Sequence, residues 1–133
     1  MRTGGAGIIV TITHGGEDNY LLCKRRDGHG VVYGGMWSVP SGGIEEGEEP
    51  DEAAVREFFE ETQVKIPIDE ITLVEVDNSK YNRDFYIYHH HSSDYFEPTL
   101  DFEHTDWGWF SHKEIPENTT PQIKHLTRYG TLT

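Results

Sequence analysis

Alternating apolar and polar positions mark the first two elements of the chain. Residues 8–12 (IIVTI) alternate between the two faces of a strand, with Ile8, Val10 and Ile12 on one side and Ile9 and Thr11 on the other. A run of turn-forming residues follows at 14–19, and a second apolar run occupies 20–25. The pattern predicts a β-hairpin at the start of the chain.

The remaining hydrophobic pattern predicts one long helix and further strands. A short apolar run at 36–39 stops at Pro40, and glycines punctuate 41–49, which we expect to be a loop. Pro50, followed by two acidic residues, begins a helix that should run to about residue 62. Strands are expected at 71–76, 84–90 and 106–110, and a short second helix at 121–129. This order predicts an α+β or α/β fold with a mixed sheet, and we expect α+β.

Length and composition narrow the class of protein. The 133 residues correspond to a single domain, residues 1–133, and the formal net charge is −13. Such a charge disfavours a basic surface for nucleic-acid polymers. No stretch approaches the roughly 18 apolar residues of a membrane span, and the first residues do not resemble a signal peptide. The single cysteine, Cys23, excludes an internal disulfide, so we expect a cytoplasmic protein with no membrane partner.

The predicted helix carries an unusual acidic side. Glu57, Glu60 and Glu61 are spaced i, i+3 and i+4, which places three carboxylates along one face. Carboxylates this close repel one another unless a cation lies among them or one is protonated. An all-oxygen set suits Mg²⁺, Mn²⁺ or Ca²⁺. The alternative is an ordinary solvated helix face, which is the usual role of a charge run.

The spacing around these glutamates is far more specific than the charge alone. Residues 42–64 fit the pattern G-x5-E-x7-R-E-U-x-E-E-x-G-U, in which U is a bulky apolar residue, at eight of nine defined positions. This stretch resembles the signature box of the Nudix hydrolase family. The one departure is Gln63, where the family has glycine. Glycine there would end the helix in a left-handed conformation, so we expect the helix end to change and the metal site to survive.

The resemblance implies an α/β/α sandwich, with the mixed β-sheet between helices, and a metal-dependent enzyme. Nudix hydrolases cut a pyrophosphate bond in a nucleoside diphosphate linked to another group, through water attack at phosphorus and with divalent cations. Mg²⁺ or Mn²⁺ is therefore the expected cofactor. By position, the resemblance assigns metal binding to the Gly42 carbonyl, Glu57, Glu60 and Glu61, and an orienting ion pair to Arg56 and Glu48.

A further acidic residue is expected in the loop that precedes the last long strand. Many members of the family have a catalytic acid there, and Glu103 occupies that place in this sequence. We interpret it as a general base or an additional metal ligand, and an exposed loop carboxylate is the equal alternative. Asp101 and Asp106 are the next candidates, and Glu60 or Glu61 could also act as the base.

The sequence indicates the substrate-binding residues less clearly than the metal-binding ones. Lys24, Arg25 and Arg26 end the second strand, where a cation could hold a phosphate or simply face water. Tyr33, Trp37 or Tyr81 could stack on a base, although aromatic residues more often pack in cores. In the tract 89–91, only His89 and His91 share a face of a strand, and two histidines alone make a poor metal site. We expect Cys23 to be a small core residue.

Two classes of function remain. The leading hypothesis is an enzyme that hydrolyses a small nucleotide, with a nucleoside triphosphate favoured by the chain's size; ADP-ribose, a sugar nucleotide, a dinucleoside polyphosphate and capped RNA stay open. The alternative is a non-catalytic nucleotide-binding or sensor module, whose usual mark would be a damaged box. A homodimer also stays open.

Nine of the 24 acidic residues lie between 42 and 61, so the negative charge is largely local and makes a cation necessary for binding phosphate.

Overall fold

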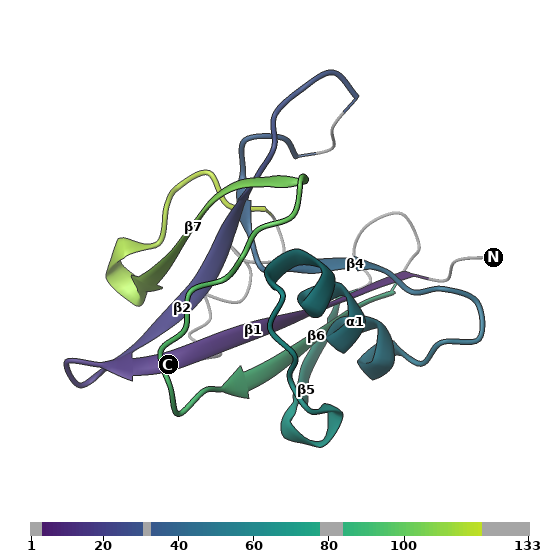
Figure 1. The fold of residues 1–133 in the computed structure, drawn as a ribbon, viewed down its shortest axis with the longest axis horizontal. Helices are drawn as coiled ribbons and strands as arrows, with labels where there is room; N and C mark the ends of the chain where they lie inside the picture. The colour runs from purple at the N-terminus through teal and green to yellow at the C-terminus, as the bar shows by residue number, and fades with distance from the viewer. Residues whose placement is uncertain (1–3, 31–32, 78–83, 121–133) are drawn as a thin grey trace.

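A mixed seven-stranded sheet forms the centre of the structure (Figure 1). The computed structural model describes residues 4–30, 33–77 and 84–120. The strands are β1 (Gly4–His14), β2 (Glu17–Arg25), β3 (Trp37–Ser38), β4 (Ser41–Gly43), β5 (Thr72–Asp77), β6 (Asp84–His91) and β7 (His104–Ser111). The helical segments are α1 (Pro50–Thr62) and the 3-10 turns η1 (Ile68–Glu70) and η2 (His112–Glu114). No helix within these described ranges has the length and apolar character that a membrane crossing requires.

Strand β1 is the axis of the sheet. The strand order is β3-β2-β1-β6-β5, β4 also pairs with β1, and β7 pairs with β2. The β1–β6 pair is parallel and the other pairs are antiparallel. Only the end of β1 pairs with β2, from Thr11 opposite Tyr20 to His14 opposite Glu17. Beyond this hairpin, β2 diverges from β1 and continues alongside β7 (Figure 1).

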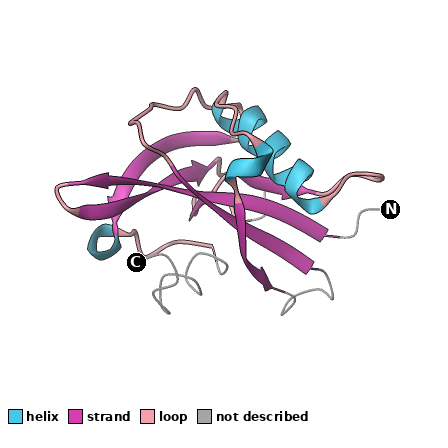
Figure 2. Ribbon diagram, turned by 90° about the horizontal axis from the view of Figure 1, so that it is seen from below, coloured by secondary structure: helices cyan, strands magenta, loops and turns pink. Residues whose placement is uncertain are grey.

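The alternation predicted in β1 is confirmed, because its two faces belong to two cores. Ile8 and Val10 pack with Ala54 and Phe58 of α1 on one face. Ile9 packs with a second group on the other face, which includes Tyr20, Leu22, Val39 and Ile87. Figure 2 shows α1 lying across one side of the sheet. The expected α+β fold with a mixed sheet is therefore confirmed, while the second helix expected at 121–129 lies outside the described residues.

The expected loop at 41–49 is wrong in its first three residues. Ser41–Gly43 forms β4 and pairs with Gly5–Gly7 of β1. A Cβ added to Gly7 would come within 2.6 Å of the Ser41 Cβ, so this pairing requires the close approach that glycine permits. Gly7 of β1 therefore allows β4 to lie close beside β1, where the glycines of 41–49 had indicated a loop.

Helix α1 begins and ends where its sequence predicts, but its exit differs from our expectation. Glu49 N–H donates to the Glu52 carboxylate at 2.9 Å, which satisfies one free backbone group at the start of the helix. At the other end Gln63 itself adopts the left-handed conformation, with φ 63°, and its N–H donates to the Phe59 carbonyl at 2.8 Å. The helix end therefore does not change. The hydrogen bonds of the cap offset the steric cost of a side chain there.

Candidate active site

Arg56 ties α1 to the loop that precedes it. Its Nε donates to Glu48 Oε2 at 2.7 Å, and its Nη2 donates to Glu48 Oε1 at 3.0 Å, which makes a bidentate pair. The same Nη2 donates to the Gly43 carbonyl at 2.9 Å. The guanidinium therefore holds β4 and the loop after it against the helix, as an orienting residue would.

The remaining donors of Arg56 point at two glutamates of the same helix. Nη1 lies 3.0 Å from Glu57 Oε2 and 3.2 Å from Glu60 Oε2. The Glu57 carboxylate also lies against Gly42, because a Cβ at Gly42 would overlap it. A side chain at residue 42 would therefore displace the Glu57 carboxylate from its present position. Glu60 is more open, with a side chain 54% exposed.

Glu61 is the most deeply buried acid of the group. Its residue is 2% exposed, and its Oε1 accepts a hydrogen bond from Ser41 N–H at 3.1 Å. Burial, with the neighbouring Glu57 carboxylate and the charge of Asp101, raises the pKa of Glu61 to about 10. The pKa of Glu57 is also raised, mainly by burial. A buried carboxylate beside a second, partly buried one is the electrostatic condition of a cation site, although Arg56 already contacts Glu57.

The loop before β7 brings two more carboxylates to this point. One carboxylate oxygen from each of Glu61, Asp101 and Glu103 lies within 4.8 Å of the others. Glu61 and Asp101 are 40 positions apart in the sequence, and the fold places the loop beside the end of α1. The loop is anchored, because Arg26 N–H donates to the Glu103 carbonyl at 2.7 Å. Asp106, the third candidate of this loop, is exposed within β7 and is not part of the cluster.

His104 is a residue of the site that the sequence reasoning missed. Its ring is buried, with Nδ1 2.9 Å from Asp101 Oδ1 and Nε2 3.7 Å from Glu61 Oε1. The ring therefore bridges the helix and the loop and fixes the direction of Asp101. Its position directly after Glu103 was the only available signal, because the expected strand began at residue 106 whereas β7 begins at His104.

The cluster fits a hard divalent cation better than any other group. Its donors are all carboxylate oxygens from two separate elements, and Mg²⁺ and Mn²⁺ prefer such ligands. Glu61 is held by a hydrogen bond from Ser41 N–H and lies near His104, so its carboxylate is directed before any ion arrives. Of the box residues expected to bind metal, Glu61 contributes to this cluster, whereas Glu57 and Glu60 contact Arg56 and lie outside it.

The residues expected to contact substrate fall into two groups. Arg25 and Arg26 lie at the end of β2 beside the acidic loop, with Arg25 paired to His104 in the strand register. Trp37 instead packs edge-to-face on Phe110, with ring centroids 5.2 Å apart, in the core on the face opposite α1. Tyr33 is half-buried in a turn with φ 58°, and Tyr81 lies outside the described residues.

Two other sequence interpretations can be checked directly. Cys23 is fully buried, as expected for a core residue, and burial raises the pKa of its thiol. His89 and His91 share a face and are bridged by the Thr11 hydroxyl, which lies 2.8 Å from a ring nitrogen of each. The described residues of this tract form a hydrogen-bonded strand and include no cluster suited to a metal.

Solved structures support the fold. A Caenorhabditis elegans Ap4A hydrolase in a binary complex superimposes with a TM-score of 0.76 at 19% identity, over 96% of this chain and 95% of that chain. The NUDIX domain of Shewanella oneidensis NrtR, solved with ADP ribose, gives a TM-score of 0.74 at 18% identity, over 100% of this chain and 90% of that one. At these identities the likeness shows the fold alone.

Sequence relatives share shorter segments. The nucleoside triphosphatase NudI of Escherichia coli is 45% identical over 53 residues, which are 40% of this chain and 37% of that protein. An octanoyltransferase of Myxococcus xanthus is 41% identical over 68 residues, 51% of this chain and 17% of that protein. The matches thus span well under two thirds of either relative. The NUDIX domain model matches residues 1–129, almost the whole chain. The chain therefore belongs to the NUDIX domain family.

Proposed function

We propose that this protein is a metal-dependent pyrophosphohydrolase that cleaves a nucleoside diphosphate-linked substrate. The observation that carries the proposal is the convergence of Glu61, Asp101 and Glu103, whose carboxylate oxygens lie within 4.8 Å of one another. A cluster of this kind beside a family box supports phosphate chemistry, because a diphosphate cannot approach so many carboxylates without a cation between them.

Separate residues of the protein would bind the cation, position the helix and accept a proton. Glu57 and Glu61, with Glu60 and the Gly42 carbonyl, would hold the cation, and Arg56 with Glu48 would keep the helix and loop in register. Mg²⁺ or Mn²⁺ bound there would neutralise the diphosphate and lower the pKa of a bound water. Glu103 is the group best placed to accept the proton of the attacking water, because it is exposed at the end of the cluster while Glu61 is buried.

Asp101 and His104 would position Glu103, the proposed base. Asp101 Oδ1 accepts from Glu103 N–H at 3.2 Å and lies 2.9 Å from His104 Nδ1. The two contacts fix the loop that carries Glu103. Arg25 and Arg26, at the adjoining end of β2, are the candidates for holding phosphate oxygens that the cation does not reach.

Nucleoside triphosphates are the first substrate class to test. The Escherichia coli relative is a nucleoside triphosphatase, and 45% identity over 53 residues supports a related substrate. The C. elegans structure is that of an Ap4A hydrolase, which makes dinucleoside polyphosphates the second class. The S. oneidensis domain was solved with ADP ribose, which makes ADP-ribose the third. Each class carries the pyrophosphate bond that the proposed reaction breaks.

The deciding experiment is a substrate panel with and without metal. The protein is incubated with each class in Mg²⁺, in Mn²⁺ and in EDTA, and phosphate, pyrophosphate and nucleotide products are measured. We expect turnover of at least one class with metal and none in EDTA. Binding of a nucleotide without turnover of any panel member would contradict the enzyme and support a sensor module instead.

A further inference from the structure

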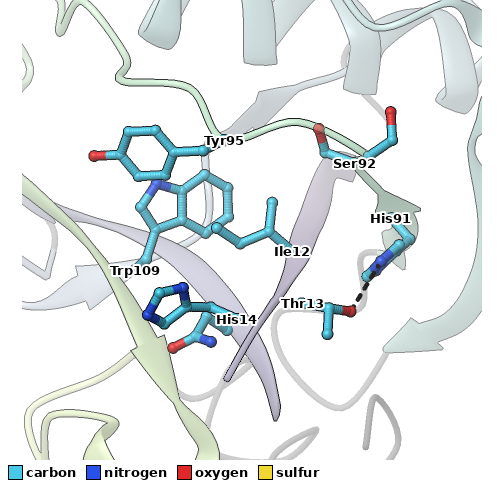
Figure 3. A pocket seen from close by; sticks show the side chains of 9 residues that line it. Ile12, Thr13, His14, His91, Ser92, Tyr95 and Trp109 are labelled. Atoms are coloured by element: carbon cyan, nitrogen blue, oxygen red, sulfur yellow. Dashed lines mark hydrogen bonds between the residues drawn. The ribbon is translucent and has the colours of Figure 1, made fainter. Parts of the chain in front are cut away.

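A second cavity lies at the hairpin end of β1, away from the acidic cluster. Its volume is about 440 Å³, within the range of roughly 300–1,000 Å³ typical of small-ligand sites. Residues of β1, β2, β6, β7 and the segment 92–95 line it, among them Ile12, His14, Trp109 and Tyr95 (Figure 3). None of its described lining residues belongs to the box or to the acidic loop.

The two sites lie at opposite ends of one strand. Gly7 of β1 pairs with Ser41, whose N–H holds Glu61. Ile12 is five residues further along β1, and a strand rises about 3.3 Å per residue. The cavity is therefore roughly 17 Å from the part of β1 that supports the acidic site. A ligand in the cavity would not need the cation.

One wall of the cavity is aromatic and held in place. The rings of Tyr95 and Trp109 lie with centroids 6.3 Å apart and planes inclined by 45°. Tyr95 is 59% exposed, yet its hydroxyl donates to Glu97 at 3.1 Å. Trp109 Nε1 donates to the Phe96 carbonyl at 3.1 Å. Two aromatic rings fixed at an open rim offer their faces to a planar group.

The rest of the described lining combines one aliphatic side chain with polar groups and has no carboxylate, ammonium or guanidinium. Ile12 forms an apolar floor, and Asn19 and two serines lie around it. His14 is exposed, and none of the described residues hydrogen-bonds to its ring, so both ring nitrogens can serve a ligand. His91 is held by Thr11 at 2.8 Å. It is also held by Thr13 at 3.3 Å, the contact drawn in Figure 3. Among the described lining residues there is no Asp, Glu, Lys or Arg, although the chain's net charge is −13.

We propose that this cavity binds a planar nitrogen heterocycle of nucleobase type, as a site separate from the acidic cluster. The flat faces of the ring would stack on Tyr95 and Trp109, and its nitrogen and carbonyl edge would exchange hydrogen bonds with His14 and Asn19. A purely apolar ring could form no hydrogen bond with His14 or with Asn19, whose Nδ2 also donates to the Glu17 carbonyl at 3.2 Å. A cation would find no carboxylate among the described lining residues. The lining is therefore most complementary to an uncharged heterocycle.

The test uses adenosine, guanosine, cytidine and uridine in EDTA, so that neither phosphate nor metal contributes. The indole N–H signal of Trp109 is followed by ¹H–¹⁵N NMR and identified by its loss in Trp109→Phe. We expect at least one nucleoside to shift this signal with saturation. Tyr95→Ala should weaken its Kd at least about tenfold, the scale of losing one stacking partner. His14→Ala should weaken it severalfold.

Matched variants separate binding from folding. Tyr95→Phe keeps the ring and should bind within about threefold of the unsubstituted protein. Ile68→Ala removes another exposed side chain, 44% exposed and outside the cavity lining, and should bind normally. Absence of a saturable shift with all four nucleosides would overturn the site, as would an unchanged Kd in a folded Tyr95→Ala protein.

Two further outcomes keep this site distinct from the proposed catalysis. Glu61→Gln should leave the nucleoside Kd unchanged, and Tyr95→Ala should leave metal-dependent turnover unchanged. If nucleoside affinity instead follows Glu61→Gln, the nucleoside occupies the acidic site and the proposal is wrong. If no substrate turns over while nucleosides still bind through Tyr95, only the proposed enzymatic function fails.

Discussion

Arg56 and Glu48 form a two-point ion pair, with Nε–Oε2 at 2.7 Å and Nη2–Oε1 at 3.0 Å. The pair is largely enclosed, with side chains 24% and 16% exposed. Lysine has the same charge as arginine but cannot reproduce its planar fork. The pair should therefore depend on guanidinium geometry as well as on charge.

A double-mutant cycle measures this dependence. Urea unfolding of Arg56→Lys, Glu48→Gln and the double variant should give a coupling free energy of about 1–3 kcal/mol, the usual range for neighbouring charged partners. Arg56→Lys should also lower turnover, because Glu57 loses its donor. Additive effects of the two substitutions on unfolding would show that the pair does not act as a unit.

The same pair predicts a pH dependence of stability. Hydrogen bonds from Arg56 lower the pKa of Glu48 below its ordinary value of 4.5. A carboxyl with a depressed folded-state pKa contributes stability above its unfolded pKa and loses it as the pH falls through the folded value. The stability advantage of the unsubstituted protein over Glu48→Gln should thus be constant near pH 7 and shrink below about pH 4.5. Urea midpoints measured from pH 7 down to pH 3 test this, and a difference independent of pH would contradict it.

Glu60 and Glu61 are predicted to be essential for turnover. Glu60→Gln and Glu61→Gln should each reduce the rate at least about 10²-fold, the scale of losing a positioned catalytic group. The comparison uses the best substrate of the panel at saturating Mg²⁺. Glu17→Gln, an exposed carboxylate in the hairpin, is the matched control and should be unaffected. Near-normal rates in both box variants would rule out the metal assignment.

Substitutions at Glu103 and Asp101 should distinguish an effect on turnover from an effect on thermal stability. Glu103→Gln is expected to slow turnover about 10²-fold with no change in Tm, because its side chain is exposed. Asp101→Asn should slow turnover and also lower Tm, because Asp101 Oδ1 is 2.9 Å from the buried ring of His104. Turnover and thermal unfolding are measured on both variants. A sharp fall in the Tm of Glu103→Gln would make this residue structural.

Gln63 offers a stabilising substitution. It holds a left-handed conformation, with φ 63°, that costs a side chain roughly 1–2 kcal/mol and costs glycine little. Gln63→Gly should raise the free energy of unfolding by about 0.5–1 kcal/mol, after allowance for glycine's greater freedom when unfolded. Turnover should not change. Gln63→Ala keeps the strain and loses the Nε2–Phe59 carbonyl contact at 3.3 Å, so it should not stabilise. A destabilised Gln63→Gly protein would contradict this account.

Local signals carried most of the successful sequence predictions. Pro50, the acidic first turn and the spacing of Glu57 to Glu61 are properties of neighbouring residues, and α1 forms where they indicate. The alternation in 8–12 likewise reports directly on the two faces of β1. Such patterns are read within one element, so no knowledge of its partners is needed.

The predictions that failed or were missing depend on contacts between distant segments. Ser41–Gly43 looked like a loop because its partner strand β1, in which Gly7 permits the close approach, is remote in sequence. His104 joins the site only because β7 places it between Asp101 and Glu61. The hairpin cavity is formed by four strands and a loop, so no single stretch of sequence predicts it.

The length of β1 has a consequence for how the protein can change. The strand supports the acidic site near Gly7 and the hairpin cavity at Ile12, roughly 17 Å apart. Effects of substitutions more than about 10 Å apart, with no shared partner, usually add. Variation at Tyr95 or His14 should therefore combine independently with variation at Glu103. One end of the strand can acquire a new ligand preference across related sequences while the chemistry at the other end is preserved.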